Sequence, residues 1–476
     1  MPKLLQINSV VNTGSTGRIA EQLGEVAMAQ GWASYIAFGR EAHESKSQLV
    51  RIGSKWGVYL HAIASKYMDN HGLMSRWATR SFLKEVDTIK PDVVHLHNIH
   101  GYYINYPMLF RYLKEKNIPT VITMHDFWLM TGHCAYINRT CDRWKNGCRN
   151  CPRLDQYPAA KRDASASNWQ KKAALFSDAP NVTLVPVSYW LGRYADESLL
   201  HPVKQQVIYN GIDTEVFKPY DMKDALVKGV DWSKFTIMTI AARWTEANGY
   251  RDVLQLSQLL PEGCQIVMVG LDTKQIKALP KNIVGFKKTE NFTQLQELYS
   301  KPDVILNPNT EVTFGLVTVE AMACGTPAIV LRDTAGEELV DEQTGFVVDK
   351  VEEVVQRIPT IKSLDKEQTA KACRQRVQTL FEASKQYQKY IDLYNRLKIM
   401  NQQKAATLPW LDLTRYVAAL LVVVGHFRAD LFLNYNDLPS NQYSALMQLA
   451  YCLTSLGHVS VLIFFVLSGY LVGGGG

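Results

Sequence analysis

A glycine-rich turn and a histidine stand where two strands of the N-terminal half are expected to end. Gly14 and Gly17 follow an apolar run and precede a helical pattern. Glycines let main-chain N–H groups approach an anion, which a helix N-terminus also favours. His125 follows the apolar run 120–124, and residues at the carboxyl ends of parallel strands line ligand crevices. We predict an anion site beside an imidazole, with a ligand-free tight turn and a structural histidine as the alternatives.

The second half carries a cation and a carboxylate in similar positions. Arg243 follows the apolar run 235–241, where a guanidinium can fork onto a phosphate. Gly315 permits close backbone approach, and Glu320 stands near the start of an expected helix. The Glu320 carboxylate could accept hydrogen bonds from two ribose hydroxyls, or simply complement the helix dipole. The first turn is not G-x-G-x-x-G, which disfavours a nicotinamide dehydrogenase.

Four of the eight cysteines fall within 18 residues, at Cys134, Cys141, Cys148 and Cys151. Four thiolates suit tetrahedral zinc. The N-terminus has too short an apolar run for a signal peptide, so we expect a cytoplasmic body with reduced cysteines. A reduced cluster in a cytosolic chain favours a structural zinc site, although its spacing is irregular, and two disulfides or free thiols are the alternatives.

Alternating apolar runs and helical patterns predict parallel α/β structure with two Rossmann-like domains. Residues 365–400 read as an amphipathic helix and 401–407 as a polar linker. The expected strands of the first domain are 4–7, 35–38, 93–96, 120–124 and 182–187. Those of the second are 206–209, 235–241, 265–269, 304–306 and 328–331.

Several segments, in this order, resemble glycosyltransferase family 4 over residues 1–400. They are Asn210-Gly-Ile-Asp-Thr-Glu-Val-Phe217, Ala242-Arg243, Phe314-Gly-Leu-Val-Thr-Val-Glu320 and Thr344-Gly-Phe-Val-Val348. Residues 94–101 and 125–134 are similar to enzymes of bacterial exopolysaccharide and O-antigen assembly. The resemblance implies a GT-B fold, with a cleft between two Rossmann-like domains. It also implies sugar transfer from a nucleotide donor with retention at the anomeric carbon.

The resemblance assigns roles to the residues that match. Gly14 and Gly17 would lie near the donor phosphates, His125 would approach the donor sugar, and Arg243 would grip the diphosphate. The backbone at Phe314, Gly315 and Leu316 would contact sugar and phosphate, and Glu320 would bind the ribose. Arg243 and main-chain N–H groups would stabilise charge on the departing diphosphate, so catalysis is expected to need no metal or other cofactor.

This sequence departs from the family pattern at two places. Asn248 stands where family members usually carry a lysine, with Arg251 nearby as a candidate to compensate. Val312 occupies the place of the first acid of the family's E-x7-E pattern, and Glu311 stands one residue early. These changes put rate and donor choice in question more than fold.

The C-terminal 72 residues, from Ala405 to Gly476, hold only five of the chain's 97 charges. Apolar stretches at 411–433 and 445–472 predict membrane contact, with a buried helical hairpin as the alternative. Arg415 and His426 fit the Arg-x10-His spacing of the acyltransferase 3 family, which this segment resembles. The segment is expected to be a truncated fusion that acts as a tether.

The sequence thus predicts four regions: an acceptor-side domain at 1–195, a nucleotide-sugar domain at 196–380, a return helix and linker at 381–404, and the membrane segment at 405–476. The expected partners are a UDP- or GDP-sugar, a lipid-linked glycan acceptor and the cytoplasmic face of the inner membrane. The net charge of +7 suits these anions and is too weak to argue for nucleic acid. A nucleotide-sugar 2-epimerase and a non-catalytic membrane-tethered scaffold are the alternative functions.

Overall fold

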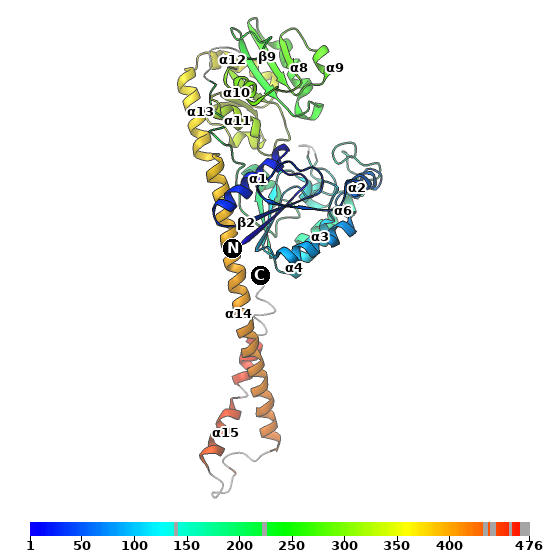
Figure 1. The fold of residues 1–476 in the computed structure, drawn as a ribbon, viewed down its shortest axis with the longest axis vertical. Coiled ribbons are helices and arrows are strands. Elements are labelled where there is room, and N and C mark those ends of the chain that lie inside the picture. Colours follow the sequence, from blue (N-terminus) through cyan, green and yellow to red (C-terminus); the bar gives the residue numbers. More distant parts are fainter. Residues whose placement is uncertain (138–140, 221–225, 432–436, 438–443, 457–458, 467–476) are drawn as a thin grey trace. The chain divides into compact units, whose positions relative to one another are not determined.

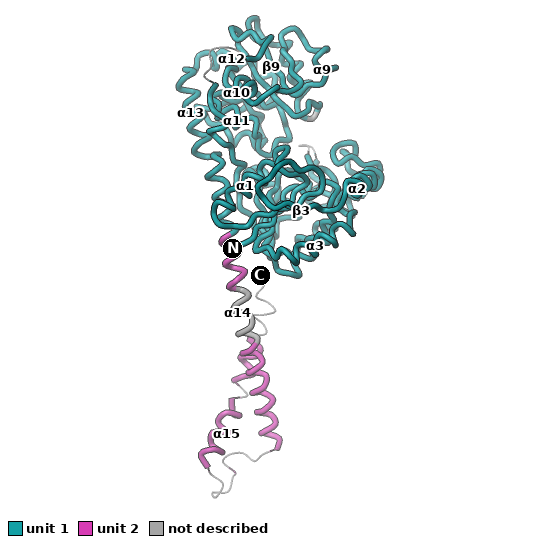
Figure 2. Tube along the Cα trace, viewed as in Figure 1, with its two compact units in different colours: residues 1–394 teal, residues 395–476 magenta. Residues whose placement is uncertain are grey.

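The computed structural model describes residues 1–137, 141–220, 226–431, 437, 444–456 and 459–466. Their contacts divide the chain into two compact units, residues 1–394 and 395–476 (Figure 2). The first unit holds two parallel sheets, so the expected architecture of two Rossmann-like domains is confirmed.

The first sheet has seven parallel strands in the order β3-β2-β1-β4-β5-β6-β7. Its central strands β4 and β5 are buried along their whole length, as expected for strands with helices on both faces. The strands are β1 (Lys3–Asn8), β2 (Ala33–Phe38), β3 (Gln48–Arg51), β4 (Val93–Leu96), β5 (Thr120–Met124), β6 (Val182–Pro186) and β7 (Lys204–Gln205). The helices are α1 (Gly14–Ala29), α2 (Lys55–Met68), α3 (Arg76–Ile89), α4 (Tyr106–Glu115), α5 (Arg143–Asn146), α6 (Ser165–Phe176) and α7 (Tyr189–Asp196) (Figure 1).

The second sheet has six parallel strands in the order β10-β9-β8-β11-β12-β13. The strands are β8 (Phe235–Ile240), β9 (Cys264–Val269), β10 (Ile283–Phe286), β11 (Val304–Asn307), β12 (Ala328–Leu331) and β13 (Gly345–Val348). The helices are α8 (Tyr250–Leu259), α9 (Thr273–Lys277), α10 (Phe292–Ser300), α11 (Leu316–Ala323), α12 (Val354–Lys362) and α13 (Lys366–Leu380).

Some sequence expectations about these elements were wrong. The strand expected at 206–209 does not form; the neighbouring β7 pairs with β6, so the first sheet extends past residue 195. The edge strands β3 and β13 and the short strand β10 were not predicted, because exposed or interrupted runs lack a continuous apolar signal. Helix and linker were expected over 365–407. Instead α13 ends at Leu380, and α14 runs unbroken from Ala383 to Leu431.

The chain crosses back to the first domain at the start of α14. Ile212 pairs with Glu382 in an isolated bridge, and a Cβ built on Gly211 would lie 2.6 Å from the Ala383 Cα. A side chain at position 211 would therefore push the two segments apart. Tyr394 then hydrogen-bonds the ring of His95 over 2.6 Å, which anchors α14 on the first sheet.

The second unit contains the rest of α14 and α15 (Ala445–Ser455). Within the described residues, Ala445–Val466 is the one stretch long and apolar enough to cross a membrane. Over its described residues, the other expected apolar stretch, 411–433, is not long and apolar enough to cross a membrane. Arg415 and His426 both lie on α14. Eleven residues are about three helical turns, so the two share one side of that helix.

Candidate active site

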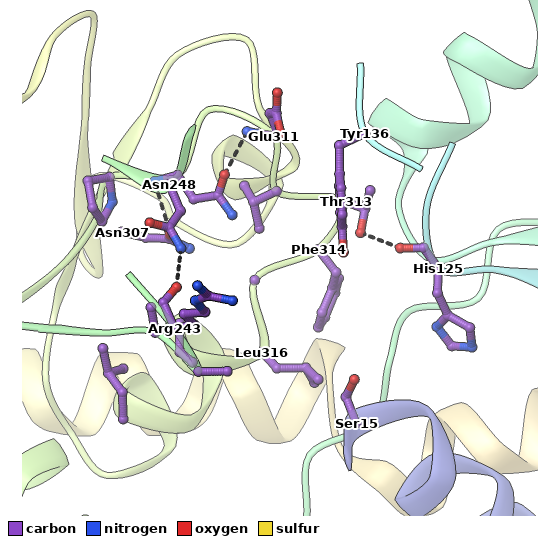
Figure 3. A pocket seen from close by; sticks show the side chains of 18 of the residues that line it. Ser15, His125, Tyr136, Arg243, Asn248, Asn307, Glu311, Thr313, Phe314 and Leu316 are labelled. Atoms are coloured by element: carbon purple, nitrogen blue, oxygen red, sulfur yellow. Dashed lines mark hydrogen bonds between the residues drawn. The ribbon is translucent and has the colours of Figure 1, made fainter. Parts of the chain in front are cut away.

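A cavity of about 460 Å³ lies between the two domains of the first unit (Figure 3). One wall comes from the carboxyl ends of β8 and β11 in the second domain, and the other from the start of α1 and the residue after β5. This is the position that open parallel sheets use for ligands. The polar or charged residues that line it include Ser15, His125, Tyr136, Asn210, Arg243, Asn248, Asn307, Asn309, Glu311 and Thr313.

Arg243 is the one Lys or Arg among the described residues that line this cavity. Its loop is held by Asn248, whose side-chain amide donates to the Arg243 carbonyl over 2.6 Å. The Asn248 oxygen accepts from the Thr245 N–H over 2.8 Å. Asn248 therefore uses its side chain to fix the turn that carries Arg243. Arg251 does not line the cavity; it pairs with exposed Glu246 over 3.0 Å.

The N-terminus of α11 also meets the cavity, through Gly315, Leu316 and Val317. Gly315 has φ +100°, and a Cβ there would lie 3.2 Å from Leu339 and 3.3 Å from the Asn307 amide. Any other residue would thus be strained in its backbone and crowded by its neighbours. The unpaired N–H groups at this helix start and the Arg243 guanidinium offer an anion two kinds of donor on one wall.

His125 faces the cavity from the first domain. Desolvation by burial lowers the pKa of His125 to about 4, with nearby Asp126 opposing the shift. The imidazole is therefore neutral near pH 7. A neutral ring can donate from one nitrogen and accept at the other, so its tautomer matters.

The His125 tautomer follows from a chain of hydrogen bonds. The Gln6 amide nitrogen donates to the Ala20 carbonyl over 2.8 Å, which leaves its oxygen to accept from His97 Nε2 over 3.0 Å. His97 Nδ1 must then be an acceptor, and it lies 3.4 Å from His125 Nε2. This chain assigns the proton of His125 to Nε2 and leaves Nδ1 as an acceptor.

Three contacts join the domains beside the cavity. The Thr313 hydroxyl donates to the His125 carbonyl over 2.8 Å, and the Ser188 hydroxyl donates to the Thr313 carbonyl over 2.8 Å. Arg153 forms an ion pair with Glu311, and both side chains are about nine-tenths buried. Desolvation at Arg153 is outweighed by this pairing, so the pKa of the guanidinium is raised. The segment 311–313 is thus fixed from the opposite domain.

A second buried pair lies next to His125. His100 Nε2 is 2.7 Å from Asp126, and His100 Nδ1 is 3.2 Å from the Tyr157 hydroxyl. Desolvation would raise the pKa of Asp126, but the His100 contact and the Trp128 N–H lower it overall. Asp126 is therefore a carboxylate near pH 7 that is already engaged by protein donors.

The structure brings some of the predicted residues to the cavity and leaves others outside it. His125, Arg243, Phe314, Gly315 and Leu316 line it, as do Asn248 and Glu311. Gly14, Gly17 and Glu320 are not among its lining residues; Ser15 and Ile19 represent α1 instead. The Glu320 carboxylate accepts from the Tyr299 hydroxyl over 2.7 Å, and burial raises its pKa.

Sequence reasoning passed over Asn307, Asn309 and Thr313. Asn307 ends β11, and its amide donates to the Thr318 hydroxyl over 3.1 Å while its oxygen accepts from the Asn309 N–H over 3.3 Å. A signal was present, because polar residues directly after an apolar strand were the signal used for His125. Thr313 had no such signal, because its partner lies 188 positions away in the chain.

The four clustered cysteines line one small cavity of the first domain. The sulfurs of Cys134 and Cys151 are 3.6 Å apart, and Cys148 accepts from the Gly132 N–H over 3.2 Å. All four are free thiols. Across the described part of the chain, however, three His, Cys, Asp or Glu side chains nowhere gather so as to hold a metal ion. The structural zinc expected at these four cysteines therefore stays a prediction.

Three protein families match successive parts of the chain. Residues 16–216 match glycosyltransferase family 4, residues 234–362 match the glycosyl transferases of group 1, and residues 408–475 match an acyltransferase domain. The chain is 24% identical over 425 residues to a glycosyl transferase named for colanic acid biosynthesis, WcaC of Escherichia coli (strain K12). That alignment covers 83% of this chain and 100% of WcaC.

Solved structures share the fold of the first unit. A sucrose-phosphate synthase from Thermosynechococcus elongatus superimposes with a TM-score of 0.62 at 17% identity, over 83% of this chain and 99% of that one. Anabaena HepE in complex with UDP superimposes with a TM-score of 0.55 at 14% identity, over 83% of this chain and 100% of HepE.

Proposed function

The chain is a glycosyltransferase with the GT-B fold, and we propose that it moves a sugar from a nucleotide-diphosphate donor to a glycan with retention at the anomeric carbon. One observation carries the proposal. A single cavity wall combines Arg243 with the N-terminus of α11, and His125 faces the same cavity from the other domain. That arrangement suits a ligand with a diphosphate at one end and a sugar at the other.

The diphosphate would lie against the second domain. The Arg243 guanidinium would pair with its oxygens, and the free N–H groups at Leu316 and Val317 would donate to them. The backbone that carries these donors is fixed before the ligand arrives, because Asn248 holds the Arg243 turn and Gly315 sets the start of α11. HepE, which shares this fold, was solved with UDP and with UDP-glucose, which supports a nucleotide sugar as donor.

The proposed reaction breaks the bond between the anomeric carbon and the diphosphate oxygen. A hydroxyl oxygen of the acceptor forms the new bond on the same face, and its proton passes to the departing phosphate. Arg243 and the α11 amides stabilise the negative charge that develops on the leaving group. Among described lining residues Glu311 is the one carboxylate, and it is paired with Arg153. A double-displacement mechanism, in which a carboxylate nucleophile forms a covalent glycosyl-enzyme, is therefore not supported.

His125 would act on the donor sugar. Its neutral ring presents Nδ1 as an acceptor, which suits a hydrogen bond from a sugar hydroxyl. Tyr136 lines the cavity on the same side and is 44% exposed, so it is placed to contact an acceptor. The relation to WcaC supports a glycan of a bacterial surface polysaccharide as that acceptor. We propose that this glycan is held on a lipid carrier.

We also propose that the enzyme works at the cytoplasmic face of the inner membrane. The acyltransferase-domain match at 408–475 and the apolar stretch Ala445–Val466 support membrane contact by the second unit. Its role in the proposal is attachment rather than acyl transfer.

The test incubates the full chain with a panel of UDP- and GDP-sugars and a lipid-linked acceptor. Release of the nucleoside diphosphate together with a glycosylated acceptor is expected for one donor, and NMR of the product should show the donor's anomeric configuration. Thermal shift with each nucleotide identifies the base, because stabilisation grows with the logarithm of ligand over Kd. A product with inverted anomeric configuration would overturn the proposal of retention. A donor epimerised at C2, with no sugar transferred to the acceptor, would overturn the proposal of glycosyl transfer.

A further inference from the structure

Helix α2 turns its apolar side outward. Trp56, Leu60, Ile63 and Tyr67 are spaced by four, three and four residues, which places them along one side of the helix. They are 76%, 63%, 37% and 53% exposed. The buried residues of α2 are the polar His61 and Ser65. A surface helix of a globular domain normally buries its apolar side and exposes its polar side, and α2 does the reverse. The exposed apolar side of α2 is therefore a candidate binding surface.

The start of α3 extends this surface. Trp77 is 82% exposed, which is more than Trp56 at 76%. A Cβ built on Gly53, just before α2, would lie 2.9 Å from the Ala78 Cβ, and the Ser75 hydroxyl is 2.8 Å from the His61 ring. The two helix starts are therefore neighbours. Figure 1 shows α2 at the outer edge of the first domain.

The exposed charges on and around α2 and the start of α3 are positive, whereas exposed Glu85 and Asp87 lie farther along α3. Between residues 51 and 84 every exposed formal charge is positive, and the one acid, Asp69, is buried against His133 at 2.7 Å. The exposed cations are Arg51, Lys55, Lys66, Arg76, Arg80 and Lys84. Two cations also lie over rings of the surface: Arg80 over Trp77 at 5.4 Å and Lys161 over Tyr67 at 4.7 Å.

We infer that the α2–α3 surface, defined by Trp56, Tyr59, Leu60, Ile63, Tyr67 and Trp77 with their flanking cations, docks on a bilayer of anionic lipids. Aromatic and aliphatic side chains with Lys and Arg beside them are what an interfacial helix needs to enter the headgroup region. A second copy of this chain is a poorer occupant, because it would set the same cations against one another. The inference rests on the proposed function only for its acceptor, since a docked first domain would meet a lipid-linked glycan.

The experiment measures binding of the full chain to phosphatidylcholine vesicles with and without phosphatidylglycerol. Leu60→Ser with Ile63→Ser should weaken binding to the anionic vesicles roughly tenfold or more. Lys55→Gln with Lys66→Gln should cost about fivefold per charge on anionic vesicles and nothing on neutral ones. Leu259→Ser and Lys281→Gln, exposed in the second domain, are the matched controls and should bind as wild type.

Fluorescence separates this surface from the apolar second unit, which has its own reason to bind vesicles. Brominated lipids should quench emission from Trp56 and Trp77. Trp56→Phe with Trp77→Phe, made in a Trp410→Phe background because Trp410 belongs to the second unit, should remove that quenching while keeping binding. Unchanged affinity in the serine and glutamine variants, or no loss of quenching with phenylalanine, would overturn the inference. Self-association lost in the serine variant without a change in vesicle binding would assign the surface to a second copy instead. None of these readouts depends on glycosyl transfer.

Discussion

The Thr313 hydroxyl donates a 2.8 Å hydrogen bond to the main-chain carbonyl of His125, across the boundary between the two domains. Thr313 belongs to the segment that leads into α11, and His125 follows β5. One bond thus fixes the distance between the proposed phosphate wall and the proposed sugar contact.

Replacing Arg243 should remove most of the charge stabilisation on the leaving diphosphate. We expect Arg243→Ala to lower kcat/KM about 10²- to 10³-fold, as loss of one fixed donor to a developing anion typically does. Arg243→Lys should recover part of the loss, because the charge returns without the planar fork. Arg251→Ala is the control: Arg251 pairs with exposed Glu246 outside the cavity, and initial rates should stay near wild type.

Asn248 should act through the turn that carries Arg243. Asn248→Ala loses the bond to the Arg243 carbonyl and the cap on the Thr245 N–H, so we expect a stability loss of about 1 kcal/mol. Steady-state rates should fall as well, because the turn that carries the guanidinium is no longer held in place. Asn248→Lys tests the family residue at this position: a lower rate than wild type supports the positioning role, and a higher rate contradicts it. Urea unfolding and donor kinetics on the same samples separate the two effects.

The Arg153–Glu311 pair should couple the domains. We expect Arg153→Ala and Glu311→Ala each to lower kcat/KM about tenfold, and the double variant to be little worse than either, because both remove one interaction. Lys145→Ala, which breaks an exposed pair with Glu197, is the control and should have almost no effect. Additive losses in the Arg153 and Glu311 cycle would show that the two residues act separately.

Gln6 should set the proton position on His125 from a distance. Gln6→Leu removes the acceptor for His97 Nε2, so both tautomers of His97 and of His125 become available. We expect kcat to fall about tenfold, together with a stability loss of about 1–3 kcal/mol, because His97 Nε2 and the Ala20 carbonyl lose their buried partner. The observation that separates this role from a packing role is the nitrogen chemical shift of His125, which should show a single neutral tautomer in wild type and a mixture in the variant.

Acid should destabilise the fold through its buried histidines. Burial lowers the pKa of His125 and of His61 from 6.5 to about 4. Between those values the unfolded chain binds protons that the folded chain does not, so the free energy of unfolding falls as the pH drops. The cost is about 1.4 kcal/mol per group for each pH unit below 6.5, down to about pH 4. Urea unfolding near pH 7 and near pH 5 measures it.

The histidine variants give that experiment its control. His125→Asn should reduce the dependence on pH by about one proton, because one buried titrating group is gone. His201→Asn, at an exposed position, should leave the dependence as it is in wild type. If the free energy of unfolding changes equally with pH in wild type and in His125→Asn, the lowered pKa of His125 is contradicted.

Much of the fold was predictable from local patterns. Buried parallel strands read as continuous apolar runs, which placed β4 and β5 and the positions of His125 and Arg243 at strand ends. The low charge density after Ala405 marked the second unit in the same way. These features depend on the composition of neighbouring residues, so one sequence contains them.

Other features depend on residues far apart in the chain, and only the tertiary structure decided them. Spacing grouped four cysteines but did not show whether their sulfurs converge, and only the tertiary structure showed that the apolar side of α2 faces outward. It placed Glu320 on a helix without showing that Tyr299 occupies its carboxylate. The bond between Thr313 and His125 joins positions 188 residues apart, and its geometry exists only once both sheets and the returning α14 have packed.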